Sequence, residues 1–216
     1  MIEIIYEDKN LTVCIKPVGY SSEDSEIAPC VPALLREHWH KPDAYVGVVH
    51  RLDMGASGLM VYARNKAAAA ALSRQVAEGN FHKEYLCVCA GTPEPALGTM
   101  EDWLFKDSHQ HKVFPVKKAR KGAKKALLDY EVLESNEESA LCRVQLHTGR
   151  THQIRVQFAS RKHPLYGDGK YGSRVKSALG LWSARLEFTL PGETEPRIFY
   201  QEPPAVGAFA PFFAAE

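Results

Sequence analysis

Strand-like segments that follow one another in pairs constrain the fold of this chain more than any other feature. Residues 83–90 alternate in the way a strand requires, with Tyr85, Cys87 and Cys89 on one side. Further strands are expected at two segments within residues 2–17 around a turn at residues 8–10, and at residues 58–63, 126–134, 140–147, 186–190 and 197–200. Neighbouring strands joined by short turns pair antiparallel. The sequence therefore predicts an α+β fold with a mixed, mainly antiparallel sheet and flanking helices, rather than a doubly wound one.

Two helices are predicted in the first half of the chain. A short one is expected over residues 31–39, beginning near Pro32. A longer one follows Asn65, a good N-cap, and contains five consecutive alanines before Gly79, a good C-cap.

A third helix is expected over residues 151–160. Thr148 is its candidate N-cap, and Ile154 and Phe158 have the spacing of a buried stripe. Residues 91–125 contain prolines, glycines and many cations, and we expect them to be loop-rich. The apolar tail from residue 205 is expected to dock on the body of the protein or on another subunit.

Composition sets the class of protein. The 216 residues are 45% hydrophobic, and neither a repeat nor a linker divides them, so we expect a single domain over residues 1–216. No run approaches the ~18 apolar residues of a membrane span. Acidic residues near the N-terminus are unlike a signal peptide, which predicts a cytoplasmic protein without a membrane partner. Five cysteines without a Cys-x-x-Cys pair predict buried free thiols in a reducing compartment.

The stretch HRLDMGASGL at residues 50–59 offers one carboxylate, Asp53, ahead of a small and flexible run. Such an acid is either a nucleophile or general base offered to a cleft, or a turn residue that binds nearby backbone amides. The residue pattern alone leaves both interpretations open.

A second stretch, LHTGRTHQIR at residues 146–155, is rich in donors and cations. Arg155 is either an exposed helix arginine or a cation that favours the ionised form of an acid such as Asp53. His147 and His152 do not have the spacing of a helical ligand pair, and no acid nearby completes a site, so no metal is expected.

Two further features suggest a polyanion as partner. Residues 117–125, KKARKGAKK, hold six cations and no acid, which is typical either of a polyanion site or of a solvated loop. Tyr85 either stacks on an unpaired base or belongs to the core of a strand. No GxGxxG, Walker-type or GxSxG motif supports dinucleotide, nucleotide or acyl-transfer chemistry.

Together these stretches resemble the RluA-type pseudouridine synthases. The matching elements occur in the family's order and span residues 16–172: Lys16-Pro17-Val18-Gly19, HRLDMGASG, Lys83-Glu84-Tyr85, TGRTHQIRV and KHPLYGDGKYG. The KPxG element begins at residue 16, so we expect only the catalytic domain, without the small RNA-binding module that precedes it in many relatives.

The resemblance implies a sheet crossed by a central RNA-binding cleft, and isomerisation of uridine to pseudouridine in structured rRNA or tRNA without metal or organic cofactor. Asp53 matches the essential aspartate, Tyr85 the tyrosine that stacks on the target base, and Arg155 the cation that pairs with the aspartate. Arg51 matches a residue implicated in displacing the target base. RNA contacts are expected from Arg51, His50, Arg150, His152, Lys117, Lys118, Arg120 and Lys121.

The sequence departs from the family pattern at Ala56, where threonine is usual, at Gln157 and around Trp182. These departures motivate an alternative, a catalytically silent RNA-binding protein or RNA chaperone on the same fold. A small-molecule hydrolase that uses Asp53 as a base is a weaker alternative. Whether Asp53 attacks the sugar or removes a proton stays open, and a monomer is the default oligomeric state.

Overall fold

The structure, a computed structural model, describes residues 1–213 and divides into two compact units. The first unit combines residues 1–83 with 182–202, and the second combines residues 84–181 with the chain from residue 203 on. The chain thus passes from one unit to the other three times. The expected single domain over residues 1–216 stays a prediction.

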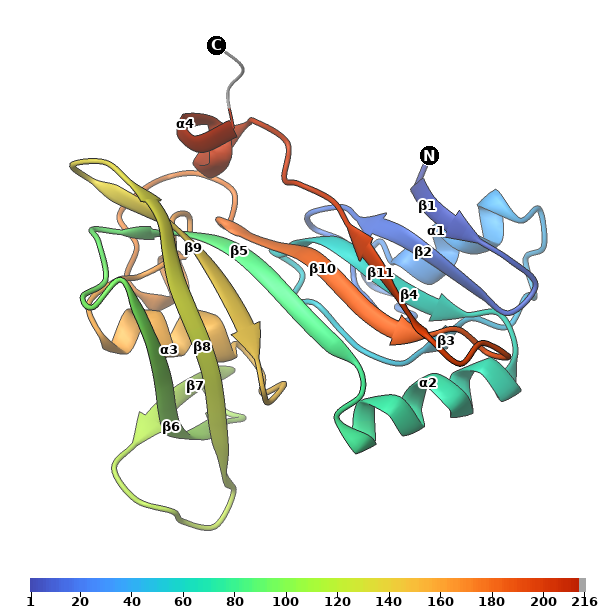
Figure 1. Cartoon of the computed structure of the whole chain (residues 1–216), viewed down its shortest axis with the longest axis horizontal. Helices are drawn as coiled ribbons and strands as arrows, with labels where there is room; N and C mark the ends of the chain where they lie inside the picture. The colour runs from blue at the N-terminus through green and yellow to red at the C-terminus, as the bar shows by residue number, and fades with distance from the viewer. Residues whose placement is uncertain (214–216) are drawn as a thin grey trace. The chain divides into compact units, whose positions relative to one another are not determined.

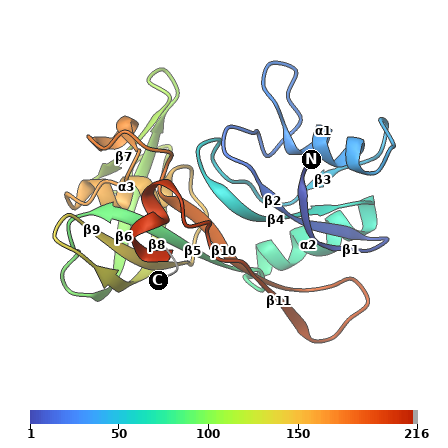
Figure 2. The same ribbon diagram turned by 90° about the horizontal axis from the view of Figure 1, so that it is seen from above.

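The first unit is built on a mixed sheet. Its strands are β1 (Glu3–Glu7), β2 (Leu11–Lys16), β3 (Gly47–Val48), β4 (Ser57–Ala63), β10 (Leu181–Thr189) and β11 (Pro196–Tyr200). β2 pairs antiparallel with both β1 and β4, β3 pairs antiparallel with β4, and β11 pairs antiparallel with β10. β4 and β10 pair in parallel, with Ser57 opposite Trp182. The hairpin of β10 and β11 is clear in Figure 2.

Two helices complete this unit, α1 (Val31–His38) and α2 (Lys66–Glu78). Both were predicted, and their ends are as expected. Pro32 lies in the first turn of α1. Asn65 caps α2 by accepting a 2.9 Å hydrogen bond from the backbone N–H of Ala68, and Gly79 is the C-cap.

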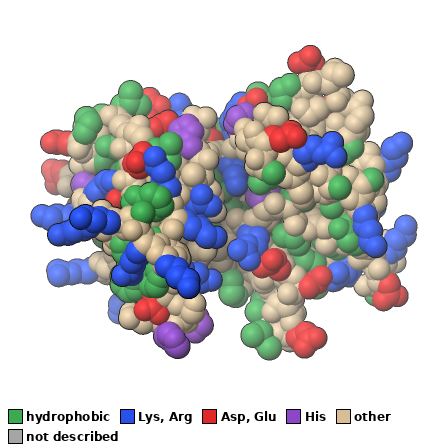
Figure 3. Space-filling view, turned by 90° about the horizontal axis from the view of Figure 1, so that it is seen from below, with side chains coloured by type: hydrophobic (Ala, Val, Ile, Leu, Met, Phe, Trp, Pro, Cys, Tyr) green, Lys and Arg blue, Asp and Glu red, His purple; other side chains and the backbone are tan. Residues whose placement is uncertain are grey.

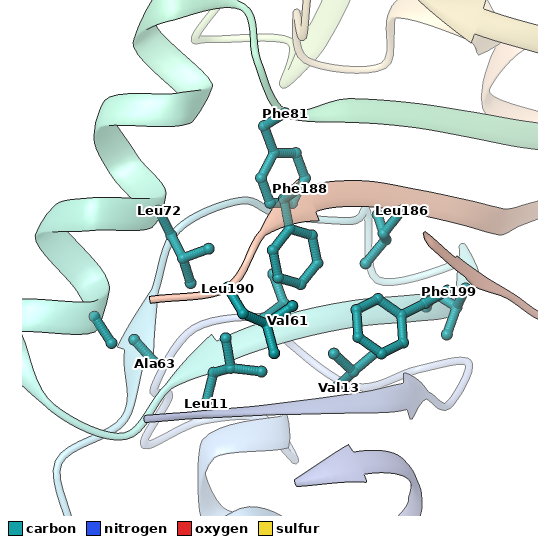
Figure 4. Packing of buried hydrophobic residues seen from close by; sticks show 12 residues of the cluster. Leu11, Val13, Val61, Ala63, Leu72, Phe81, Leu186, Phe188, Leu190 and Phe199 are labelled. Atoms are coloured by element: carbon teal, nitrogen blue, oxygen red, sulfur yellow. The ribbon is translucent and has the colours of Figure 1, made fainter. Parts of the chain in front are cut away.

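The core of the first unit lies between α2 and the sheet. Leu72 of α2 packs with apolar side chains of β2, β4, β10 and β11, and the two groups point toward one another in Figure 4. The rings of Phe81 and Phe188 stack with centroids 5.2 Å apart. This apolar layer fixes the strands whose ends carry the loops described below.

The second unit is an antiparallel sheet with one helix, α3 (Gln153–Ser160), and its strands fan out beside one another in Figure 1. The strand order is β5 (His82–Ala90), β9 (Ser139–Leu146), β8 (Ala123–Ser135), β6 (Leu97–Asp107) and β7 (Lys112–Val116). Val156 of α3 packs against Leu104, Val113 and Ala126 of this sheet. Ile154 and Phe158 are buried, as predicted. The α+β class is therefore confirmed, whereas the central RNA-binding cleft stays a prediction.

Two sequence predictions for this unit were wrong. Residues 91–125, expected to be loop-rich, contain β6, β7 and the start of β8, and no strand was predicted there. Within β6 only Met100 and Leu104 are buried, so the alternation that marks a strand is weak. Thr148 does not cap α3, whose N-cap is His152 in a left-handed conformation (φ 53°). The hydroxyl of Thr148 instead accepts from the Leu127 amide at 2.9 Å and donates to Gln153 Oε1 at 2.8 Å.

Further expectations concern the tail, the cysteines and the membrane. In the tail, the helical turns η2 (Gly207–Phe209) and α4 (Ala210–Phe213) form, and Ala208 and Phe209 are buried, while residues 214–216 lie outside the described part. All five cysteines are free and buried, as predicted. Among residues 1–213, no helix has both the length and the apolar character of a membrane span.

Candidate active site

Asp53 lies in a tight turn between β3 and β4 of the first unit. Its side chain is half-buried, and its backbone carbonyl accepts a 3.0 Å hydrogen bond from the amide of Ala56. The turn therefore closes through the backbone of Ala56. One of the two interpretations made Asp53 a turn residue, and the backbone does turn here, while the catalytic role of its side chain stays a prediction.

The buried ammonium group of Lys16 donates hydrogen bonds to the backbone of this turn. Lys16, the last residue of β2, is fully buried, and its Nζ donates to the carbonyls of Pro17 at 2.9 Å, Met54 at 3.3 Å and Ala56 at 2.7 Å. Burial lowers the pKa of Lys16 to about 8, and attraction to the Asp53 carboxylate opposes that shift. Two carbonyls of the turn thus depend on one cation. Sequence reasoning quoted Lys16 within a family element but did not predict this role.

Ser22 anchors the turn at its N-terminal side. The Leu52 amide donates to Ser22 Oγ at 3.0 Å, and that hydroxyl donates to the Leu52 carbonyl at 2.9 Å. The hydroxyl of Tyr62 on β4 donates to the Ser22 carbonyl at 3.0 Å. Asp53 is therefore flanked by backbone that is fixed on both sides.

Gly58 lets β4 approach β10 closely after the turn. Its φ is +112°, and a Cβ built at this position would lie 2.4 Å from the carbonyl oxygen of Ser183. No other residue type fits there without moving the parallel pair of strands.

His50 is buried in the first unit and serves its backbone. The ring is 7% exposed, and Nε2 accepts a 3.1 Å hydrogen bond from the Val61 amide. Burial, with a smaller contribution from nearby Lys83, lowers the pKa of His50 to about 3, so the ring is neutral at pH 7. His50 thus has a structural contact, and its expected contact with RNA stays a prediction.

Arg51, in contrast, is exposed. Its guanidinium donates to Glu23 Oε2 at 2.9 Å, and both side chains are more than half exposed. An exposed pair of this kind contributes at most about 1 kcal/mol to stability, so an anion such as phosphate can compete for the arginine.

Tyr85 and Arg155 both belong to the second unit. Tyr85 lies on β5 opposite Val144 of β9 and is 5% exposed. Arg155, in the first turn of α3, binds Asp168 through two hydrogen bonds, Nε to Oδ2 at 2.7 Å and Nη2 to Oδ1 at 2.8 Å. Asp168 belongs to the KHPLYGDGKYG stretch, and sequence reasoning gave it no role. The sequence therefore did not predict Asp168 as a partner of Arg155.

A tyrosine and a histidine extend this cluster. His152 Nδ1 and the Tyr171 hydroxyl are 2.7 Å apart, and the same hydroxyl accepts from the Val113 amide at 3.0 Å. The Arg155 guanidinium lies over the Tyr171 ring, 5.2 Å from its centroid. Tyr171 therefore links the N-terminus of α3 to strand β7.

The basic loop, residues 117–125, comprises the connection from β7 to β8 and the first three residues of β8. Its expected RNA-binding cations are all exposed: Lys117, Lys118, Arg120 and Lys121. The guanidinium of Arg120 lies over the Phe105 ring at 4.1 Å, and Arg150 Nε donates to the Lys125 carbonyl at 2.8 Å. Figure 3 shows Lys and Arg side chains gathered on this unit, in the left of the view. The loop thus presents several cations to solvent on one surface.

The three residues that depart from the family pattern each form hydrogen bonds within their own unit. Ala56 is buried, and its amide and carbonyl both belong to the Asp53 turn. Gln157 is fully buried and donates to the Met100 carbonyl at 3.0 Å and to Asp102 at 2.8 Å. Trp182 Nε1 donates to the Gln201 carbonyl at 2.7 Å. Among residues 1–213, no cluster of three or more His, Cys, Asp or Glu side chains could hold a metal ion.

Comparison with known proteins defines the class. The fold is that of solved pseudouridine synthase structures: human RNA pseudouridylate synthase domain containing 1 aligns with a TM-score of 0.80 and 24% identity, covering 95% of this chain and 85% of that one. The sequence model described as RNA pseudouridylate synthase matches residues 10–160. The chain belongs to this family.

Curated relatives give the same family. An "Uncharacterized RNA pseudouridine synthase" of Aquifex aeolicus is 38% identical over 188 residues, covering 82% of this chain and 58% of the relative. The "Ribosomal large subunit pseudouridine synthase D" of Borreliella burgdorferi is 33% identical over 199 residues, covering 86% of this chain and 60% of the relative. This chain therefore spans about three fifths of the length of these relatives. The family match includes Asp53, Tyr85 and Arg155 but ends before Asp168 and Tyr171.

Proposed function

We propose that this chain isomerises uridine to pseudouridine in RNA, with Asp53 as the catalytic residue. The observation that carries the proposal is the turn that presents Asp53, which is anchored by the buried Lys16 ammonium and by Ser22. If Asp53 were only a turn residue, the turn would not need the Lys16 ammonium, because burying an ammonium group is costly. Membership of the family agrees with this interpretation.

The reaction conserves every atom of the uridine. The target nucleotide must leave its stack, at a cost of a few kcal/mol that contacts with the flanking phosphates offset. Asp53 then assists cleavage of the bond between the sugar and ring nitrogen 1, either by attack on the sugar or by removal of a proton from it. The uracil turns within the site and rejoins the sugar through carbon 5, which then loses its proton, while ring nitrogen 1 ends with a proton in place of the sugar.

Other residues have roles that the family resemblance implies. Tyr85 stacks on the target base, an interaction worth ~1–3 kcal/mol. Arg155 is the cation of the site, and Arg51, Arg150, His152 and the basic loop contact RNA. Arg51 can exchange its exposed partner Glu23 for the RNA.

The proposed substrate is structured ribosomal or transfer RNA, and the name of the relative from Borreliella burgdorferi favours the ribosomal one. We also propose that the chain acts in the cytoplasm as a monomer, with no metal or organic cofactor.

The test uses unmodified ribosomal and transfer RNA transcribed in vitro, with chemical mapping of pseudouridine. We expect product with the wild-type chain, and a loss of at least about 1,000-fold in rate for Asp53→Asn with RNA affinity preserved. Asp43→Asn, at an exposed aspartate of the same unit, is the matched control and keeps full activity.

The silent RNA-binding alternative predicts a different result. It gives RNA binding without product on either RNA. Because the substituted Ala56 still supplies both of its backbone contacts to the turn, the structure gives this alternative no support. An Asp53→Asn variant with undiminished activity would overturn the assignment of Asp53.

A further inference from the structure

We infer that Asp168 is a positioning residue that fixes the Arg155 guanidinium for the reaction, with Tyr171 as its support. This inference rests on the proposed function. Four observations within the second unit carry it, namely the ion pair itself, its place on helix α3, the loop that holds the acid and the ring that supports the cation.

The ion pair is buried and doubly hydrogen-bonded. The Asp168 side chain is 1% exposed and that of Arg155 is 11% exposed. Asp168 precedes the short helix η1 (Gly169–Tyr171) as its N-cap, yet its side chain makes no capping hydrogen bond. An aspartate at an N-cap normally binds the free amides of the helix. Here both carboxylate oxygens accept from Arg155 instead, so the acid serves the cation rather than its own helix.

The position of Arg155 on α3 disfavours a cation. It is the third residue of the helix, where the free amides and the macrodipole are positive. A buried ion pair is also seldom better for stability than apolar side chains of the same volume. Helix stability therefore does not explain an arginine here, whereas a function for its positive charge does.

The loop that carries Asp168 is rigid on both sides of it. The amides of Tyr171 and Ser173 both donate to the Asp168 carbonyl at 3.0 Å. Before the acid, Gly167 has φ +74°, and a Cβ there would lie 2.3 Å from the Ala178 carbonyl oxygen. The Tyr166 amide donates to the Val88 carbonyl of β5 at 2.9 Å. The carboxylate is thus fixed relative to the strand that bears Tyr85.

The Tyr171 ring provides a second restraint on the guanidinium of Arg155, in addition to the ion pair with Asp168. Asp168 fixes the plane of the guanidinium through two hydrogen bonds. The Tyr171 ring lies against the guanidinium, whose central carbon is 5.2 Å from the ring centroid. The Tyr171 hydroxyl is itself held by the Val113 amide and by His152. A guanidinium restrained in this way keeps one orientation, which is what a preorganised charge at a reacting centre needs.

The experiment compares Asp168→Asn with the wild-type chain in single-turnover and steady-state assays on the same RNA. We expect kcat to fall at least tenfold while KM for RNA changes less than twofold. Asp102→Asn is the matched control, because it breaks another Arg–Asp pair, with Arg161, the C-cap of α3, at 2.8 Å. This control keeps its kcat.

A double variant separates positioning from a general loss of stability. If Asp168 acts through Arg155, Arg155→Ala with Asp168→Asn is no slower than Arg155→Ala alone. The inference is overturned if the Asp168→Asn chain keeps its kcat, or if its full effect persists without the arginine.

Failure of the proposed function would be visible separately, because the wild-type chain would then make no pseudouridine. In that case the Arg155 Nε–H signal in ¹⁵N NMR tests whether Asp168 positions the guanidinium. A slowly exchanging signal in the wild-type chain that is lost in Asp168→Asn supports it. A signal that is unchanged by the substitution overturns it.

Discussion

Replacement of Lys16 by methionine tests whether a buried charge supports the Asp53 turn. Methionine fills a similar volume but cannot donate to the carbonyls of Pro17, Met54 and Ala56, which Lys16 contacts at 2.9, 3.3 and 2.7 Å. A buried carbonyl without a donor costs about 1–3 kcal/mol, and removal of the costly ammonium offsets part of the sum. At pH 7 we expect the Lys16→Met chain to be less stable by about 2 kcal/mol.

The dependence on pH gives the sharper result. The pKa of Lys16 falls from 10.5 in the unfolded chain to about 8 in the folded one. Between these values the unfolded state binds more protons, so the unfolding free energy of the wild-type chain rises with pH. This contribution is complete above pH 10.5 and is lost as the pH falls through 8. At about 1.4 kcal/mol for each tenfold change in proton affinity, it amounts to about 3 kcal/mol.

Urea unfolding followed by circular dichroism at pH 7, 8.5 and 10 measures the difference between the two chains. We expect this difference to grow with pH, because methionine has no proton to lose. Lys66→Met, at an exposed lysine of the same unit, is the control and shows no such growth. A difference that stays constant from pH 7 to 10, or a methionine variant that is more stable than wild type at pH 10, would refute the reasoning.

Two further predictions concern the basic loop and the contact of β4 with β10. Replacing the four expected RNA-binding cations of the loop by alanine should weaken RNA binding. It should also reduce the slope of log affinity against log salt concentration by about one per lost phosphate contact, as measured by filter binding from about 50 to about 300 mM salt. Unchanged affinity and slope would remove the loop from the RNA interface. Gly58→Ala should lower the unfolding free energy by more than about 3 kcal/mol, because its Cβ would meet Ser183 backbone at 2.4 Å. Gly79→Ala, where nothing lies within 4 Å, should cost only about 1 kcal/mol in the same denaturation assay.

Features with local causes were predictable from the sequence. The ends of α2 follow from Asn65 and Gly79, since a cap depends on residues within one turn. The buried stripe of α3 follows from the spacing of Ile154 and Phe158. Strand β6 was missed because only Met100 and Leu104 of its side chains are buried, so its apolar residues do not alternate clearly.

Partners that come from distant parts of the chain were not predictable in this way. Lys16 and Ala56 are 40 residues apart, and only the pairing of β2 with β4 brings them together. Asp168 follows Arg155 by 13 residues through a loop whose path depends on Gly167 and its neighbours. The KPxG and KHPLYGDGKYG elements marked these residues as part of the family pattern, but a pattern does not state which atoms meet.

The five buried thiols make each unit report on its own unfolding. Cys14 and Cys30 belong to the first unit, and Cys87, Cys89 and Cys142 to the second. A thiol reagent can modify a buried cysteine only while the surrounding structure is transiently open. The rate at which each cysteine is modified in the native protein therefore measures the opening free energy of its unit, without any added label.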